Sequence, residues 1–315
     1  MIKIAAFSDS HIDYTTPAMR KDDYLQSILA EFEYMLSYCE NEGIEYLLCS
    51  GDLFHRAEQS GTVQRLVTLL LKKYQSVHLI STLGQHDVNG HNTSGYLTKS
   101  IGILEANDLV TVLTHGQELK LYDKVVVRGY AFNEPETIDF LKGVDGSLDD
   151  EKIQIAIVHA SVGKKGDVTY GNEIENQNIK SADISIFGDI HPGWGVHEFP
   201  NGCNAFNLGS FGRRNIEDHG RPQMFLVLEI KEDASEWGYS FVTVPTPPED
   251  DVWFTVEEEA AAKDISEEFR AEWSKAKLFR DETPTQMAKR IGELFEHTQD
   301  EILLVIQNLP EEALA

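Results

Sequence analysis

Several short apolar runs in the first two thirds of the chain end in side chains that can bind metals or carry protons. Four runs are continuous enough to be buried strands, and a fifth mixes polar and apolar residues. The runs cover residues 4–7, 46–49, 77–83, 155–158 and 184–187. Polar side chains that follow parallel strands meet at one edge of an α/β sheet. The pattern therefore predicts a sheet that gathers such side chains along one edge.

Helix-forming segments alternate with the first of these runs. Residues 22–42 carry Leu, Ile, Phe and Met at helical spacing and end at Gly43, and residues 61–74 repeat the arrangement. Alternating strands and helices predict βαβ units. Shorter strands that follow suggest a second sheet packed on the first, then a polar loop and a closing hairpin. These segments are 110–112, 118–121 and 124–130 for the second sheet, 163–178 for the loop, and 225–230 with 239–244 for the hairpin.

A proline-rich and then acidic stretch from Pro245 to Asp251 marks a domain boundary. We expect a core over residues 1–245 and an acidic helical extension over 246–315. The helices predicted in the extension cover 265–279, 285–295 and 300–309. The predicted fold class is α/β: a sandwich of two sheets built from βαβ units and flanked by helices, with a short helical C-terminal extension.

Composition indicates a soluble globular protein. Apolar residues make up 41% of the 315 positions and charged residues 25%. The N-terminus enters a strand without a leader-like segment, and no apolar run approaches the roughly 20 residues that span a bilayer. The 3 cysteines are widely spaced, which argues against a disulfide framework. We therefore expect a cytoplasmic protein with no membrane association.

The net charge of −26 weighs against tight autonomous binding to nucleic acid. Residues 246–315 hold 18 acids and 7 bases, so most of the excess lies on the core. Local basic spots follow the motif strands at Arg56, Lys164-Lys165 and Arg213-Arg214. They either line the rim of a site or are scattered solubilising charge.

The polar residues that follow the apolar runs form an ordered set of five motifs. They are Asp9-Ser10-His11, Gly51-Asp52, Gly84-Gln85-His86-Asp87, the lone His159, and Gly188-Asp189-Ile190-His191. Over roughly residues 1–245 the chain resembles the calcineurin-like metallophosphoesterases. Their pattern is Asp-x-His, Gly-Asp, Gly-Asn-His-Asp/Glu, a lone His and Gly-His-x-His. The stretches Gly51 to His55 and Asn207 to Ser210 are similar to the Mre11/SbcD nuclease branch of that superfamily.

The resemblance implies a two-metal centre. Matching the motifs assigns Asp9, His11 and His191 to one ion, Asp52 to the bridge, and Gln85, His159 and Asp189 to the other ion. Two cations roughly 3.5–4 Å apart acidify a water for in-line attack on a phosphodiester. Considered without the other motifs, His159 could equally be a buried core histidine. Only its place in the order of the family motifs identifies it as a ligand.

The resemblance also assigns the residues that move protons and hold the substrate. His86 would protonate the leaving oxygen, and Asp87 would orient its imidazole and keep it basic. His55 would contact the substrate phosphate beside the ions.

Two positions depart from the family pattern, both at the second ion. Gln85 replaces the usual Asn, and Asp189 replaces the usual His. The resulting ligands are harder and more negative, so Mn²⁺ is the expected ion and Mg²⁺ the alternative. A one-metal or inactive centre is the competing interpretation.

The leading hypothesis is a metal-dependent DNA nuclease, the subunit that pairs with a coiled-coil ATPase of the Rad50/SbcC type. The extension would dock that partner, which would supply affinity for DNA. Members of the family commonly form dimers, and helices over 22–42 or 61–74 are candidates for such an interface, although packing on the sheet explains their apolar stripes equally well. Two rivals are a phosphodiesterase or phosphatase acting on small phosphoesters, and a catalytically silent scaffold.

Overall fold

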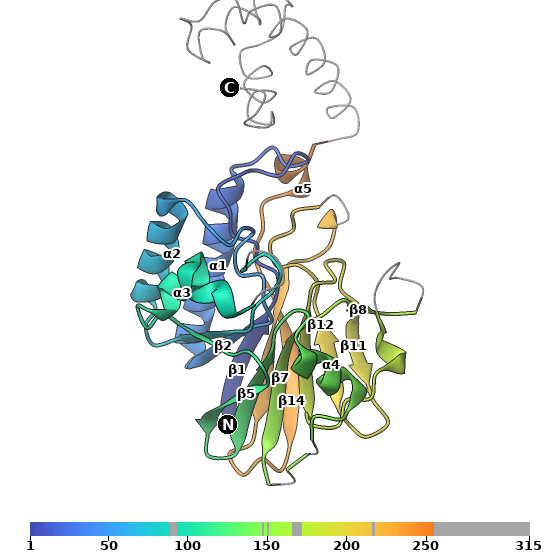
Figure 1. Cartoon of the computed structure of the whole chain (residues 1–315). Helices are drawn as coiled ribbons and strands as arrows, with labels where there is room; N and C mark the ends of the chain where they lie inside the picture. The colour runs from blue at the N-terminus through green and yellow to red at the C-terminus, as the bar shows by residue number, and fades with distance from the viewer. Residues whose placement is uncertain (89–92, 147, 150, 166–171, 216–217, 255–315) are drawn as a thin grey trace, which may run out of the picture. The chain divides into compact units, whose positions relative to one another are not determined.

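The strand-forming runs assemble into two six-stranded mixed sheets in the computed structural model of the chain (Figure 1). The structure describes residues 1–88, 93–146, 148–149, 151–165, 172–215 and 218–254. The chain divides into a larger unit, residues 1–15 and 23–246, and a smaller unit, residues 16–22 and 247–315. The helices expected over 265–279, 285–295 and 300–309 lie outside the described residues.

The first sheet has the strand order β14-β13-β1-β2-β3-β4. Its four strands from β1 to β4 are parallel neighbours, while β13 runs antiparallel to β1, and β14 antiparallel to β13. The strands are β1 (Ile2–Phe7), β2 (Tyr46–Cys49), β3 (His78–Ser81), β4 (Val110–Val112), β13 (Met224–Ile230) and β14 (Trp237–Thr243). The predicted closing hairpin is therefore confirmed as β13 and β14.

The second sheet has the order β11-β12-β10-β7-β6-β5. Strands β12, β10, β7 and β6 are parallel neighbours, and the two edge strands run antiparallel to them. The strands are β5 (Gln117–Tyr122), β6 (Val125–Tyr130), β7 (Ile153–His159), β10 (Ile184–Gly188), β11 (Gly195–Glu198) and β12 (Asn204–Asn207). Two motif strands, β7 and β10, thus lie side by side in its centre.

Two expectations need correction. Residues 110–112 were predicted in the second sheet, but β4 pairs with β3 in the first sheet. The short helix α3 (Ser100–Glu105) leads back to that sheet and continues the parallel series. Residues 163–178 were predicted to be a loop, yet β8 (Val162–Gly163) pairs with β9 (Asn172–Glu173). A 3-10 turn, η2 (Ile174–Asn176), follows them, and another, η1 (Thr93–Thr98), precedes α3.

The two predicted long helices begin and end where their capping residues dictate. Helix α1 (Tyr24–Glu42) starts two residues later than expected, because the Asp23 side chain accepts the Gln26 N–H and caps it. It ends at Gly43, which takes the left-handed conformation. Helix α2 (Gly61–Lys73) begins after Ser60, whose hydroxyl accepts the Val63 N–H. Helix α4 (Pro135–Lys142) has proline in its first turn.

Alternation along the strands separates three layers of core. Ala5 and Phe7 face a cluster that contains Phe32 of α1 and Val67 of α2. Their neighbour Ile4 belongs to a second cluster, together with Ile155 of β7 and other residues of the second sheet. A third cluster joins the other face of β7 and β10 to α4. The larger unit is therefore a two-sheet sandwich with helices outside each sheet, as the sequence predicted.

The described part of the smaller unit is a short antiparallel contact. Arg20 and Trp253 form an isolated bridge, and the Arg20 guanidinium lies 5.5 Å from the Trp253 ring centre. Asp22 accepts from the same guanidinium at 2.8 Å. The short helix α5 (Glu249–Val252) precedes Trp253. Over the described part of the chain, every helix is too short or too polar to cross a membrane.

Candidate metal centre

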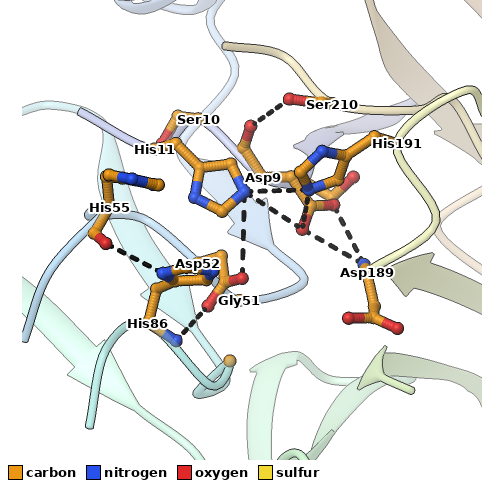
Figure 2. Close-up of polar contacts among 12 residues, drawn as sticks. Asp9, Ser10, His11, Gly51, Asp52, His55, His86, Asp189, His191 and Ser210 are labelled. Carbon is orange, nitrogen blue, oxygen red and sulfur yellow. Dashed lines mark hydrogen bonds and ion pairs between the residues drawn. The ribbon is translucent and has the colours of Figure 1, made fainter. Parts of the chain in front are cut away.

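All five motifs converge at one edge of the sandwich. Figure 2 labels residues of every motif except His159. Three follow β1, β2 and β3 of the first sheet, and two follow β7 and β10 of the second. Ser50 links the two sheets at this edge. Its hydroxyl donates to the Ile186 carbonyl at 2.8 Å, and its own carbonyl lies 2.7 Å from Nδ1 of His159. The carboxyl ends of both sheets thus form one polar neighbourhood.

Three of the motifs begin with a glycine, and close packing around each of these glycines leaves no room for a side chain. A Cβ on Gly51 would lie 2.5 Å from Nδ1 of His159, and one on Gly84 would lie 2.0 Å from Oδ1 of Asp52. At Gly188 it would lie 2.5 Å from the Ser50 carbonyl oxygen. These separations are well inside van der Waals contact. Glycine therefore lets the motif backbones approach one another closely enough to share a centre.

The backbone of the centre is held in an uncommon conformation. Positive φ angles occur at Asp9 (53°), His11 (45°), Asp52 (52°) and Asp189 (83°), although none of these residues is glycine. Such angles cost free energy at each residue and persist where surrounding contacts impose them. Here the Asp9 N–H donates to the Gly51 carbonyl and the His11 N–H to the Asp52 carbonyl. In this backbone conformation the side chains of the four residues point into the centre.

Asp9, His11 and His191 form what we call the first half of the centre. Nε2 of His11 lies 3.0 Å from Nε2 of His191, and each nitrogen lies 4.0 Å from Oδ1 of Asp9. Adjacent ligands of an octahedral ion with bonds of about 2.1 Å are about 3.0 Å apart. Two ring nitrogens that face each other at this distance fit one shared cation.

Gln85, His159 and Asp189 form the second half. Nδ1 of His159 can only donate to the Ser50 carbonyl, which leaves Nε2 to face the centre. Nε2 lies 2.8 Å from Oε1 of Gln85 and 3.8 Å from Oδ1 of Asp189. The Gln85 amide donates to that same Asp189 oxygen at 2.7 Å, and Ser161 donates to the other. The two unusual residues are therefore hydrogen-bonded to each other.

Asp52 stands between the halves. Its Oδ1 accepts the His86 N–H at 2.8 Å. Its Oδ2 lies 3.5 Å from Nε2 of His159 and 3.8 Å from Nε2 of His11. Among the described residues this buried oxygen has no hydrogen-bond partner. Without ions the His159 ring is the nearest cationic group to this oxygen, and divalent ions bound beside the His159 and His11 nitrogens would take its place. The donor set therefore fits the two ions that the sequence predicted.

His86 and Asp87 take different places in the third motif. Nδ1 of His86 lies 2.8 Å from the His55 carbonyl, and the His55 ring stacks on the His86 ring with centres 4.8 Å apart. The Asp87 carboxylate instead accepts the backbone N–H groups of Gly84, Asp52 and Phe54. The expectation that Asp87 orients the imidazole directly is thus corrected. Its carboxylate is engaged by backbone donors, and the His55 carbonyl occupies the orienting position.

Burial and charge shift the ionisation of the two halves in opposite directions. Burial lowers the pKa of His11 well below 6.5, although Asp52 opposes the shift. Burial also opposes protonation of His159, but Asp52, Asp9 and Asp189 together raise its pKa to about 10. Burial, Arg214 and His86 lower the pKa of His55 to about 3. Without ions, therefore, His11 and His55 are neutral at neutral pH and His159 is protonated.

A basic and aromatic rim adjoins His55. We use "rim" for Tyr14, Arg56 and Arg214. The guanidinium carbon of Arg56 lies 5.4 Å from the Tyr14 ring centre, and both side chains are 48% exposed. Arg56 and Arg214 approach the same buried Asp13 oxygen, at 3.3 and 3.9 Å. Arg213 is buried and does not belong to the rim.

Several residues that support the centre were not predicted. Ser50 and Ser161 adjoin predicted motifs, so their position in the sequence was the available signal. Asn215, whose amide lies 3.2 Å from Nδ1 of His191, directly follows the basic pair Arg213-Arg214, and that pair was the nearest available signal. A cavity of about 460 Å³ lies beside this pair, lined by His191, Trp194, Asn215 and neighbouring residues. It offers room for a substrate group next to the first half.

Comparison with known proteins agrees with this geometry. Residues 2–193 match the model of the calcineurin-like phosphoesterase family. Among solved structures, a dimetal phosphatase from Danio rerio is similar with a TM-score of 0.50 and 10% sequence identity. The alignment covers 78% of this chain and 99% of that chain. At this identity the likeness concerns the fold alone. No curated protein matches the chain.

Proposed function

The chain belongs to the calcineurin-like phosphoesterase family, and from this premise we propose that it is a metal-dependent nuclease that hydrolyses phosphodiester bonds of DNA. The observation that carries the proposal is the convergence of seven ligand-type side chains beside a basic and aromatic rim, of which Tyr14 and Arg56 are exposed. The convergence supports phosphoester hydrolysis. The rim supports a nucleic-acid substrate.

The seven side chains would hold two divalent ions, with Asp52 between them. When bound, such ions supply a nucleophile at neutral pH and neutralise charge on the phosphoryl oxygens. The oxygens of Asp9, Asp52, Gln85 and Asp189 favour Mn²⁺ or Mg²⁺ over softer ions. We propose Mn²⁺ as the preferred ion. His159 must lose its proton before its Nε2 can bind one.

In this proposal His86 would deliver a proton to the leaving oxygen. A carbonyl only accepts hydrogen bonds, so the contact with His55 keeps a proton on Nδ1 of His86. The transferable proton therefore resides on Nε2 when the ring is cationic. His55 is neutral, so its stacked ring does not repel a cationic His86 as a second charge would. His55 would bind the phosphate as a neutral hydrogen-bond partner.

The rim supplies contacts that a small phosphate ester does not use. An exposed aromatic ring stacks on a nucleobase, worth about 1–3 kcal/mol per base. An arginine can bind a neighbouring phosphate with two parallel hydrogen bonds. Tyr14 and Arg56 offer these groups together, and Arg56 directly follows His55 in the chain. They would bind the strand beside the scissile bond on an otherwise acidic protein.

The test compares DNA with a small diester. The full chain is incubated with Mn²⁺ and either labelled oligonucleotides, single-stranded and duplex, or bis-(p-nitrophenyl) phosphate. We expect cleavage of both, and none of either by Asp52→Asn. Tyr14→Ala should raise the KM for the oligonucleotide about 5- to 150-fold, equivalent to about 1–3 kcal/mol, and leave the small diester unaffected. Equal loss on both substrates, or no cleavage of DNA, would refute the nuclease proposal.

A phosphodiesterase or phosphatase acting on small phosphoesters is the second candidate. The net charge of −26 favours it, because such a surface repels a long phosphate backbone. The fold likeness to a dimetal phosphatase is compatible with it. Turnover of the small diester or of p-nitrophenyl phosphate, without cleavage of DNA, would select this candidate. If no substrate shows metal-dependent turnover, the catalytically silent scaffold is the hypothesis that remains.

A partner ATPase with a long coiled coil remains a prediction from the sequence. Its expected docking segment falls on residues 265–309, outside the described residues. If the prediction is right, deleting residues 250–315 abolishes co-purification with a co-expressed ATPase of the Rad50/SbcC type, while turnover of the small diester persists. Unchanged co-purification would contradict it.

A further inference from the structure

A second group of metal-binding side chains lies apart from the centre described above. His115 lies between β4 and β5, and Glu134 and Glu136 flank the start of α4. One ligand atom from each lies within 4.8 Å of the others. Nδ1 of His115 is 3.3 Å from Oε1 of Glu134 and 3.4 Å from Oε2 of Glu136. Neighbouring ligands of a tetrahedral ion with bonds of about 2.1 Å are about 3.4 Å apart, so the spacing fits such an ion.

The buried carboxylate of Glu134 is the observation that points to a ligand. Glu134 is only 4% exposed. Its Oε2 accepts the backbone N–H of His115 at 2.7 Å, which fixes the orientation of the group. Its Oε1 is buried and accepts no hydrogen bond within the part of the chain that the structure describes. Although Glu134 is the N-cap of α4, its side chain makes no cap hydrogen bond. The carboxylate is therefore aimed at His115 rather than used by its own helix.

The surroundings attract cations. A cavity of about 510 Å³ adjoins the group, and its charged lining residues are His115, Glu118, Arg128, Glu136, Asp139 and Asp145. The guanidinium of Arg128 is engaged by Glu118 at 2.8 Å. The other carboxylates leave the cavity negative, which raises the local concentration of cations. The open cavity also gives water access to complete a coordination shell.

We propose that His115, Glu134 and Glu136 form a further divalent cation site, suited to Zn²⁺, with water as the remaining ligand. One imidazole and two carboxylates with an open position are a ligand set that zinc accepts. The ion would fix the segment from β6 to α4. That segment contains Phe132, whose ring packs against His159 with centres 6.0 Å apart and whose N–H donates to the Leu83 carbonyl. The site would thus stabilise one wall of the catalytic centre.

The test counts zinc in the full-length protein. Equilibrium dialysis at micromolar free Zn²⁺ compares the wild type with His115→Ala and Glu136→Gln. Glu118→Gln is the matched control, because it removes a charge from the same cavity without touching the three ligands. We expect both ligand variants to bind one ion fewer per chain, with at least about tenfold weaker affinity for that ion. The control should keep the wild-type count.

Anomalous diffraction from Zn²⁺-soaked crystals locates the ion. The proposal expects a peak bonded to Nδ1 of His115 and Oε1 of Glu134 in the wild type, absent in Glu136→Gln. Glu136 is partly exposed, so its variant should fold even if His115→Ala does not, and circular dichroism checks both. Equal zinc content in all variants and no peak would overturn the proposal. The three side chains would then only contact one another, without a bound ion.

Discussion

The polar side chains in the two halves of the metal centre are paired in different ways. In the first half, the ring nitrogens of His11 and His191 face each other at 3.0 Å and can share a single hydrogen bond, in which one ring donates and the other accepts. In the second half, Gln85 donates to Asp189, Ser161 donates to the same carboxylate, and the charge on His159 is balanced by carboxylates. A shared cation would have to replace only the contact between His11 and His191 in the first half. The second is already a closed hydrogen-bond network.

The difference coincides with the departures from the family pattern. The first half keeps the expected Asp-x-His and final His, whereas both replaced residues, Gln85 and Asp189, lie in the second. The hydrogen bonds within the second half must break before an ion can bind there. Breaking them costs part of the free energy of ion binding. Two sites that share Asp52 therefore need not bind ions with equal affinity. We expect the first half to bind its ion more tightly.

Asp52→Asn should produce the largest loss, because Asp52 is the residue common to both halves. Without its charge neither ion is held correctly, and activity on the small diester should fall by at least about a thousandfold, or about 4 kcal/mol. Steady-state kinetics with Mn²⁺ measure it. Asp123→Asn, on the surface, serves as control. A mild loss would show that the halves work without a shared carboxylate.

His86→Ala should remove proton transfer and leave both halves loaded. We expect turnover of the oligonucleotide to fall about a hundredfold to about ten-thousandfold. The loss should be much smaller on bis-(p-nitrophenyl) phosphate, since nitrophenolate leaves without a proton. Metal content by mass spectrometry should match the wild type. An equal loss on both substrates would argue that His86 holds the centre together instead.

Asp189→Asn tests the second half by itself. Losing one charge should weaken the weaker of two Mn²⁺ binding events by at least about tenfold, while the tighter event stays unchanged. His191→Asn is the matched variant, and it should weaken the tighter event. Isothermal titration calorimetry separates the two events. If both variants affect the same event, the division into a tight and a weak half is wrong.

The smallest expected effect is the release of a proton when ions bind. Free His159, with a pKa of about 10, carries a proton at neutral pH and must give it up to bind a metal through Nε2. Loading should therefore release about one proton per chain near pH 7.5, and apparent affinity should rise with pH up to about 10. Calorimetry in buffers of different ionisation enthalpy measures the release. Heats that do not depend on the buffer would contradict the ionisation assigned to His159.

Local sequence patterns predicted the strands, the two long helices and the convergence of the motifs. This worked because each ligand either ends a strand or lies within four residues after one, so the strand places it and few other contacts are needed. The sequence pattern did not predict to which of the two sheets β4 belongs. Its three residues suit either sheet, and the choice depends on where α3 returns the chain.

Contacts between distant segments were the part that the sequence did not reveal. Asp87 is adjacent to His86 in the chain, yet its carboxylate binds backbone groups of the second motif. Asn215 reaches His191 from a segment without a motif. Pairing between Gln85 and Asp189 joins residues that are 104 positions apart, and it is visible only after folding. Adjacency in sequence is therefore a poor guide to hydrogen bonding inside such a centre.

The most direct test of the two-half centre is anomalous diffraction from a crystal of the full-length protein loaded with Mn²⁺. We predict two peaks about 3.5–4 Å apart. One should be bound by Asp9, His11 and His191, the other by Gln85, His159 and Asp189, with Asp52 touching both. A single peak, or a second peak that Gln85 and Asp189 do not contact, would contradict the account.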